Sequence, residues 1–533
     1  SLMKSLKYKI IDKTMMKLKN IFGILAISAV SMMTVSCSDD IMDRINRDEA
    51  HPGGNAVTAN IQLSDAIVAS VFTTNCGNFA WYASIYTEQT FGTGNNQAKN
   101  AELRNVNEIA ASSTFDNEWN GTYLNLNNIK QLIAKCDEGG VSVGQSDIQG
   151  MGQVLAAYNW SILTDLFGDI PCSKALTDGV SAPALDKQED IYNHCFTLLD
   201  AAITNFDKAI AGKMKNAGAQ DVLFANDNAK WRGLAHALKA RLYLHELGRA
   251  TDKNAQLTNV LTEANAAIAD GFDGATLNVF DGNANVNSWS AYWNSRDYIA
   301  STTTVNDLLT ARQDPREPIY HYDIYYNFYG PKNGFQPSTT ICTPGNESQA
   351  KSQYYNAPEW LSYGCDGGAV GSHMFSKSEL YFIIAEVKAR LGQDAKADFE
   401  TAVKASMEDY AASSGETISD DAVSAYLAGE TATKFAANPL SEILVQKYIA
   451  QTRDEQLETY NDMRRCNYVD GSYPVAMTNP KNTQANANRW PLRLPYGSSD
   501  VLSNPNVKEA FGSGNDAGMY IFTENVWWAG GSR

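Results

Sequence analysis

Basic residues are scarce in this chain, and their scarcity excludes several classes of protein. The 533 residues include 43 Lys and Arg against 60 Asp and Glu, a formal net charge of −17 at pH 7. Nucleic-acid-binding proteins need basic patches that neutralise phosphates, and proteins adsorbed to anionic lipid need a basic face. We therefore expect no nucleic acid among the partners of this protein, and no adsorption to anionic lipid.

The short motifs of common cofactor, metal and catalytic sites are also missing. The eight cysteines form no Cys-x-x-Cys pair, and His245-Glu246 has no second His four residues on. Residues 140–144 match Gly-x-Ser-x-Gly but lie between two predicted helices, whereas a nucleophile elbow follows a strand. We expect no catalytic residue, no metal ligand and no cofactor. The sequence nominates no carboxylate pair for glycoside hydrolysis, because the separation of two carboxylates is a three-dimensional property.

Long apolar runs are absent, with one short exception near the start. Residues 21–30 are almost wholly apolar and follow Lys17 and Lys19. This stretch is too short to cross about 30 Å of hydrocarbon, and it is typical of a secretory signal. We predict an upstream extension and signal peptide over 1–36, with the signal itself at 16–36.

The end of this signal predicts a lipid anchor. It reads Thr-Val-Ser-Cys up to Cys37 and is similar to a bacterial lipobox; the alternative is an ordinary cleaved signal with a chance cysteine. We expect lipid on Cys37 and a tether over 37–55. Residues 1–36 contain six Lys and one Asp, so the chain from Cys37 onward carries a formal charge of −22.

Helical periodicity dominates residues 56–533, which we expect to form a single domain. Apolar residues between 146 and 167 recur at intervals of three and four, the spacing of one buried helix face. The predicted helices are 56–75, 117–137, 146–167, 188–211, 228–248, 255–269, 376–391, 394–410, 438–450 and 453–465.

Several of these helices form pairs, over about 117–270 and 376–465. Within 378–406, Ala395, Phe399 and Ala402 have the spacing of the second helix of a tetratricopeptide repeat. The predicted fold is mainly α, a tetratricopeptide-like scaffold of helical pairs.

Two long segments, about 271–375 and 466–533, differ from the helical pairs. They are rich in Gly, Asn, Ser and Tyr, which favours loops and short strands. Their aromatic residues argue against disorder. We predict loop-rich, aromatic-rich inserts that face a ligand.

Five stretches in a fixed order give the chain a resemblance to a known family. After Cys37 come YNWSILTDLFGDIPCSKAL (158–176), ARQDPREPIY (311–320), QKYIAQTRDEQLETYNDMRRCNY (446–468) and RWPLRLPYGSSDVLSNPNV (489–507). The set resembles the SusD/RagB family of nutrient-binding outer-membrane lipoproteins of Bacteroidetes. The resemblance implies a surface-exposed, non-enzymatic, SusD-like protein that delivers its ligand to a SusC-like TonB-dependent β-barrel transporter.

Aromatic residues outside the predicted helices are the ligand-binding candidates. A flat ring packs on the apolar face of a sugar, and neighbouring polar side chains bond the hydroxyl groups. The preferred cluster is Trp289, Tyr292, Trp293 and Asn294; the other candidates are Trp81, Tyr82, Tyr325, Tyr326, Tyr329 and Trp360. For each ring the alternative is packing of its loop onto the scaffold. We expect an oligosaccharide ligand; a peptide ligand and a surface glycosidase are the alternatives.

Overall fold

The structure is a computed structural model that describes residues 57–94, 97–361, 369–482 and 487–533. The chain divides into two units, Ser1–Val57 and Thr58–Arg533, and the second contains all but one of the described residues. The predicted signal peptide, Cys37 and the tether lie outside the described residues. Lipidation therefore stays a prediction.

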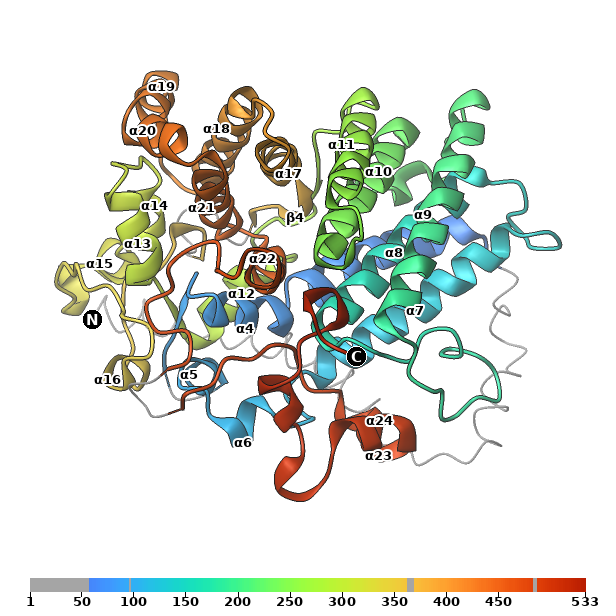
Figure 1. Cartoon of the computed structure of the whole chain (residues 1–533), viewed down its shortest axis with the longest axis horizontal. Helices are drawn as coiled ribbons and strands as arrows, with labels where there is room; N and C mark the ends of the chain where they lie inside the picture. Colours follow the sequence, from blue (N-terminus) through green and yellow to red (C-terminus); the bar gives the residue numbers. More distant parts are fainter. Residues whose placement is uncertain (1–56, 95–96, 362–368, 483–486) are drawn as a thin grey trace, which may run out of the picture. The chain divides into compact units, whose positions relative to one another are not determined.

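Helical pairs form most of the second unit (Figure 1). In each of three pairs, two helices that are consecutive in the scaffold pack on each other: α8 (Ser146–Phe167) with α9 (Gln188–Ala211), α10 (Asn228–His245) with α11 (Lys253–Ala269), and α17 (Lys377–Arg390) with α18 (Lys396–Ala412). The scaffold also includes α7 (Asp116–Cys136), α21 (Pro439–Gln451) and α22 (Gln456–Asp470). The predicted pairs are confirmed, and their helices begin and end within a few residues of the predicted bounds.

Local signals in the sequence set the ends of these helices. The Ser376 hydroxyl accepts a hydrogen bond from the Glu379 N–H at 2.9 Å and caps α17. Helix α8 stops at Gly168, whose φ of +77° lies in the region that favours glycine. Phe399 is buried in a hydrophobic cluster with Ala395 and Ala402, as the repeat spacing predicts.

The N-terminal and C-terminal segments flank the scaffold with shorter elements. The first are the 3₁₀ turn η2 (Ala59–Gln62), α3 (Leu63–Ala69), the π-helical η3 (Ser70–Asn75), α4 (Asn78–Tyr86), α5 (Gln97–Glu102) and α6 (Val106–Ile109). The last are α23 (Ser498–Ser503), α24 (Pro505–Phe511) and η11 (Trp527–Ala529), while α19 (Asp420–Ala428) and α20 (Glu430–Ala437) lie between α18 and α21.

The insert between α11 and α17 contains more helix than its composition predicts. Its helices are α12 (Ser288–Arg296), α13 (Thr303–Thr310), α14 (Glu317–Tyr320), α15 (Ile324–Tyr329) and α16 (Glu347–Ala350). Asn287 and Asp323 start two of them, because each side chain accepts a hydrogen bond from the N–H two or three residues on. Some of the polar residues that favour loops in the sequence are thus helix caps, so the insert contains short helices as well as loops and strands.

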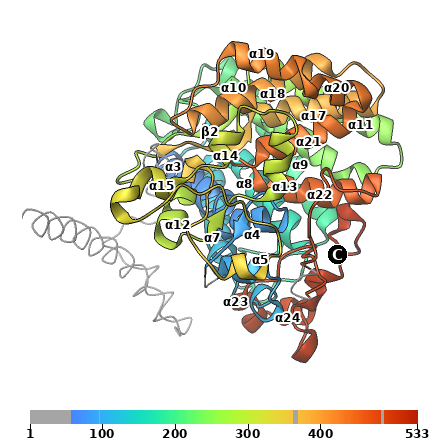
Figure 2. The ribbon, with the colours of Figure 1, turned by 90° about the vertical axis from the view of Figure 1, so that its left-hand side faces the viewer.

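One small antiparallel sheet fastens this insert to the segment after α4, and a second pairs the two ends of the insert with each other. Strand β1 (Phe91–Gly92) pairs with β3 (Ile299–Ala300), and β2 (Gly274–Leu277) pairs with β4 (Ser372–Ser376), which leads into α17. Helices α13, α14 and α15 lie on the left in Figure 1, the side that faces the viewer in Figure 2.

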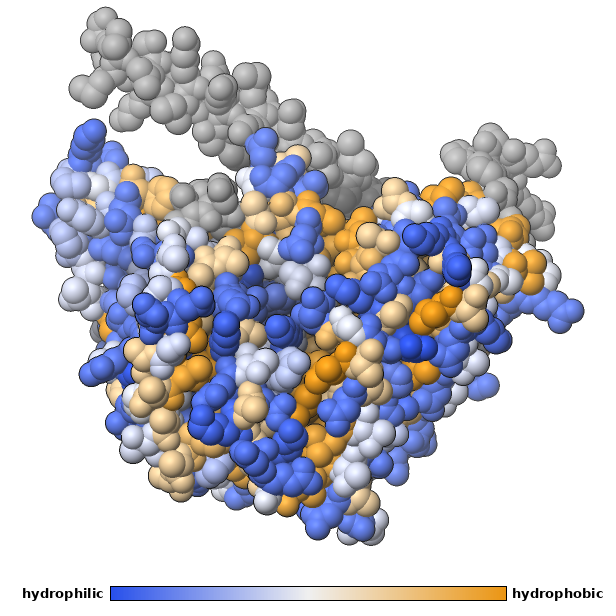
Figure 3. All heavy atoms as spheres, turned by 90° about the horizontal axis from the view of Figure 1, so that it is seen from above, coloured by the Kyte–Doolittle hydropathy of each residue, from blue (hydrophilic) through white to orange (hydrophobic). Residues whose placement is uncertain are grey.

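Polar residues cover most of the face shown in Figure 3, and apolar residues lie between them in narrow strips. Across the described ranges, no helix is both long enough and apolar enough to cross a membrane. All six cysteines that the structure describes are buried free thiols, and Cys365 lies outside the described residues.

Candidate functional site

A cluster of four rings lies on α15 and on the segments that follow it, and one of them is buried while the other three are partly or largely exposed. We refer to Tyr325, Tyr329, Phe335 and Tyr354 as the aromatic platform. Tyr329 and Phe335 lie 6.2 and 5.6 Å from Tyr325, at interplanar angles of 26° and 22°, while Tyr354 meets Tyr325 edge-on at 5.1 Å. Tyr354 is 57% exposed and Tyr329 49%, so two rings of the platform are open to solvent.

Two buried arginines fix this insert to the scaffold. Arg312 binds both carboxylate oxygens of Glu442 on α21, at 2.8 and 2.7 Å. Arg316 binds both oxygens of Asp314 and also donates to Ser406 and Gln446 on α18 and α21. Such bidentate contacts hold planar groups in one orientation. The ARQDPREPIY stretch therefore positions the insert and takes no direct part in the platform.

The three predicted rings of α12 are buried, each at most 6% exposed. Tyr292 stacks on Trp81 of α4 with ring centroids 3.7 Å apart. The Trp293 indole N–H donates to the carbonyl of Ile299 at 3.2 Å, and its ring lies 5.7 Å from Tyr325. These contacts are the packing that was the alternative to ligand binding, and a ligand contact by Trp289, Tyr292 or Trp293 stays a prediction.

The remaining candidates lie in different settings. Trp360 is buried and packs edge-on against Tyr410 of α18. Tyr326 is half-buried beside the platform, and the side chain of Asn294 lies outside the described residues. Tyr82 is buried in α4, and burial is the main cause that raises its pKa, with smaller effects from the carboxylates of Glu118 and Glu108.

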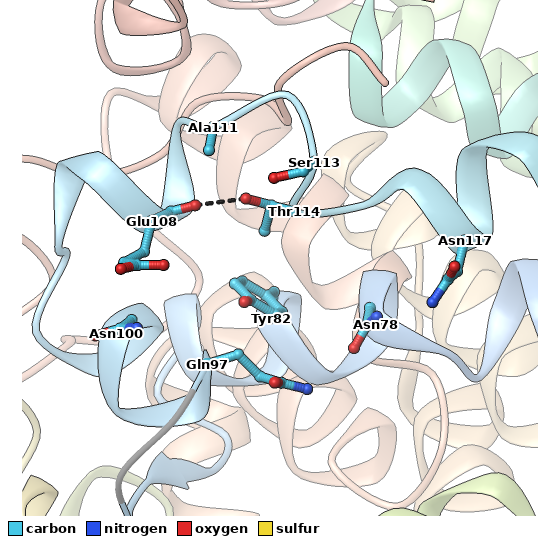
Figure 4. A pocket seen from close by; sticks show the side chains of 9 residues that line it. All are labelled: Asn78, Tyr82, Gln97, Asn100, Glu108, Ala111, Ser113, Thr114 and Asn117. Atoms are coloured by element: carbon cyan, nitrogen blue, oxygen red, sulfur yellow. Dashed lines mark hydrogen bonds between the residues drawn. The ribbon is translucent and has the colours of Figure 1, made fainter. Parts of the chain in front are cut away.

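Tyr82 lines a polar hollow, which we refer to as the polar pocket, with a volume of about 350 Å³ (Figure 4). The pocket lies between α4, α5, α6 and the start of α7. Its lining residues are Asn78, Tyr82, Gln97, Asn100, Glu108, Ala111, Ser113, Thr114 and Asn117. Thr114 donates its hydroxyl to the carbonyl of Glu108 and closes the turn above Tyr82.

Helices α4 and α12 connect the polar pocket to the aromatic platform. On α4, Tyr82 lines the pocket while the neighbouring Trp81 stacks on Tyr292. On α12, the residue after Tyr292 is Trp293, which contacts Tyr325 of the platform. The two surfaces thus share a continuous packed support.

Asp165, His245 and Glu458 form the one group of three potential metal ligands among the described residues. Protein groups already occupy their hydrogen-bonding positions. The His245 Nε2 lies 2.9 Å from Glu458, and its Nδ1 lies 2.8 Å from the hydroxyl of Tyr192. Asp165 also accepts the Trp528 indole N–H at 2.9 Å. This arrangement is a closed, buried hydrogen-bond network. Both imidazole nitrogens already have protein partners, so nothing here favours a bound metal ion.

Sequence reasoning missed Phe335 and Tyr354 of the platform and Glu108, Ser113 and Thr114 of the pocket. A weak signal for Tyr354 exists, since it stands in a polar Ser-Gln-Tyr-Tyr-Asn stretch. The pocket residues come from four helices and the turn after α6, and the turns between α5 and α7 bring them together.

Comparisons with known proteins agree with this architecture. A family described as starch-binding and associating with the outer membrane matches residues 58–497. A SusD/RagB family protein from Bacteroides thetaiotaomicron is 32% identical, with a TM-score of 0.79 and coverage of 90% of this chain and 100% of that one. A search of curated proteins finds no match.

More distant structures share the fold. A SusD homolog from Bacteroides fragilis is 19% identical, with a TM-score of 0.69 and coverage of 89% of this chain and 100% of that one. A chitin-binding SusD homolog from Flavobacterium johnsoniae is also 19% identical, with a TM-score of 0.64 and coverage of 88% and 98%. The family match and the 32% identical structure each span most of the chain, and the protein therefore belongs to the SusD-like family of outer-membrane nutrient-binding proteins.

Proposed function

We propose that this protein is a surface lipoprotein that captures an oligosaccharide and delivers it to a SusC-like TonB-dependent transporter. The aromatic platform is the observation that carries the proposal. The rings of Tyr329 and Phe335 lie within 26° of parallel to the ring of Tyr325. Tyr329 and Tyr354 are about half exposed. Ring faces of this kind pack on the C–H faces of sugars.

The backbone at Tyr354 supports a binding role for the platform. Its φ of +69° is in the left-handed region, which costs a non-glycine residue about 1–2 kcal/mol. An exposed side chain that contributes little to the core does not offset this cost by burial. Strain retained at an exposed ring is typical of functional positions.

The polar pocket favours binding over catalysis. Glu108 is the one carboxylate among the described residues that line it, and glycoside hydrolysis generally uses two. Peptides also bind in aromatic pockets, usually with added backbone pairing. Peptide binding is therefore the second candidate, and the same experiment distinguishes it.

The anchor and the transporter complete the proposal. Lipid on Cys37 would hold the protein at the outer membrane, and a separate channel must carry the ligand across. Cys37→Ala should release the protein from the membrane fraction, and mild detergent extraction of the native protein should recover a SusC-like barrel with it. Unchanged fractionation of the variant would refute the anchor, and recovery of the chain alone would refute the partner.

The binding proposal is tested with a glycan and peptide array, followed by calorimetry on the best ligand. Tyr354→Gly and Tyr329→Ala should each weaken binding about tenfold, since each removes one stacking ring. Leu502→Ala on α23 is the control, because Leu502 is an apolar side chain that is 83% exposed. Peptide ligands in place of glycans, or an unchanged affinity in the variant that combines Tyr354→Gly with Tyr329→Ala, would contradict the proposal.

A further inference from the structure

The polar pocket contains hydrogen-bonding groups that the protein itself leaves unused. Tyr82 is only 4% exposed, and its hydroxyl makes no hydrogen bond to any described residue. Its ring is held in place by Phe115 at 4.8 Å and Tyr86 at 6.0 Å. The hydroxyl itself is not fully buried, since it belongs to a residue that lines the pocket, so water can bond it and a ligand can take the place of that water.

Asn78 presents a second unused group in the same pocket. Its amide nitrogen donates to Glu118 at 3.1 Å, which fixes the side chain, while its Oδ1 is buried and has no hydrogen-bond partner. In Figure 4 Tyr82 lies between Asn78 and Glu108. The pocket therefore holds a fixed acceptor on one side of the phenol and a carboxylate on the other.

The charge of the pocket is of one sign. The Glu108 carboxylate forms no ion pair or hydrogen bond with the described residues, and none of the nine lining residues is Lys or Arg. A second carboxylate, that of Glu118, lies behind Asn78. Free carboxylate oxygens accept hydrogen bonds from hydroxyl groups, whereas an anionic ligand would meet repulsion with no cation to offset it.

We infer that the polar pocket binds one neutral sugar unit and rejects acidic sugars, with Glu108 and Tyr82 as its specificity-determining residues. The inference rests on the proposed glycan-binding function and adds a ligand class to it. Neighbouring hydroxyls of the sugar donate to the carboxylate of Glu108 and to Oδ1 of Asn78. The Tyr82 hydroxyl donates to a ring or hydroxyl oxygen. Uronate, sulfate and phosphate groups are excluded by charge.

Two conservative substitutions isolate these roles. Tyr82→Phe keeps the packed ring and removes a hydroxyl that has no protein partner, so the melting temperature should be unchanged. Glu108→Gln keeps the shape and removes the charge at an exposed position. Glu408→Gln is the matched control, because Glu408 is also an exposed helix carboxylate, on α18, and lies outside the polar pocket.

The test uses an array that pairs neutral oligosaccharides with their uronate and sulfated counterparts. The native protein should prefer the neutral member of each pair that it binds. Glu108→Gln should lower that preference about tenfold, and Tyr82→Phe should weaken neutral binding about threefold to tenfold without loss of stability. An unchanged preference in Glu108→Gln, or native binding that favours the acidic member, overturns this inference alone. Absence of all glycan binding overturns the proposed function and this inference with it.

Discussion

Charged side chains fill the interior where α8, α10, α17 and α22 meet, whereas rings fill the interior of the insert around α12. In the scaffold, Arg465 binds Glu386 at 2.6 Å and Asp462 at 2.8 Å, and all three side chains are buried. Arg241 binds Glu379 at 2.7 Å in the same region. In the insert, Trp81 stacks on Tyr292, and Trp293 contacts Tyr325.

The two kinds of interior tolerate change differently. Removal of one member of a buried ion pair leaves a charge without a partner and costs about 3–5 kcal/mol. Removal of an exposed ring from an aromatic cluster leaves no such charge, and its cost depends on the area that was buried. The insert can therefore vary its exposed rings, and with them its ligand, while the scaffold holds them in position.

Trp289→Ala tests the insert interior and should have the largest effect. Trp289 is 3% exposed, so its removal should lower the free energy of unfolding by about 3–5 kcal/mol, as measured by urea denaturation. The matched control is Phe328→Ala at a ring that is 42% exposed, where the loss should stay below about 1 kcal/mol. A small loss of stability in Trp289→Ala together with weaker ligand binding would place Trp289 in the binding surface.

Most of the scaffold could be predicted from the sequence, because one-sided helical burial leaves a period that can be read directly. The partners of the buried charged residues could not be predicted in this way. From the sequence, Arg464 and Arg465 stand at the end of the predicted helix 453–465 and are expected to form local ion pairs there. The contact of Arg465 with Asp462 fits that interpretation. The contact with Glu386 joins residues 79 apart in sequence, and α22 continues to Asp470. Sequence spacing contains no information on such a contact.

Less of the candidate site could be predicted. Composition located the aromatic segments but could not separate Trp293, which is buried, from Tyr329, which is exposed, because both stand among polar residues. That difference depends on which face of α12 meets α4. The polar pocket depends on turns that bring Tyr82 and Glu108 together, and neither residue is unusual in its local sequence.

His245 tests the scaffold interior through pH. Burial alone would lower the pKa of this imidazole, but the carboxylates of Glu458 and Asp165 outweigh it and raise the pKa to about 9. An unfolded histidine has a pKa of about 6.5. Because the folded pKa is the higher one, the stabilisation is fully present below about pH 6.5 and is lost as the pH rises through 9.

The expected loss from His245 is about 3 kcal/mol between these two pH values, since each pKa unit corresponds to about 1.4 kcal/mol. Glu102 and Glu246 have pKa values raised from 4.5 to about 7, mainly by burial, so the decline of stability that they cause falls between these values and overlaps only the start of this range. A stability curve alone would mix the three groups. NMR titration of the imidazole in the folded protein assigns the effect, and the His245 signal should titrate near pH 9. A midpoint at or below about 6.5 would show that burial outweighs the two carboxylates, and the charged interior of the scaffold would then be held by its arginines without this histidine.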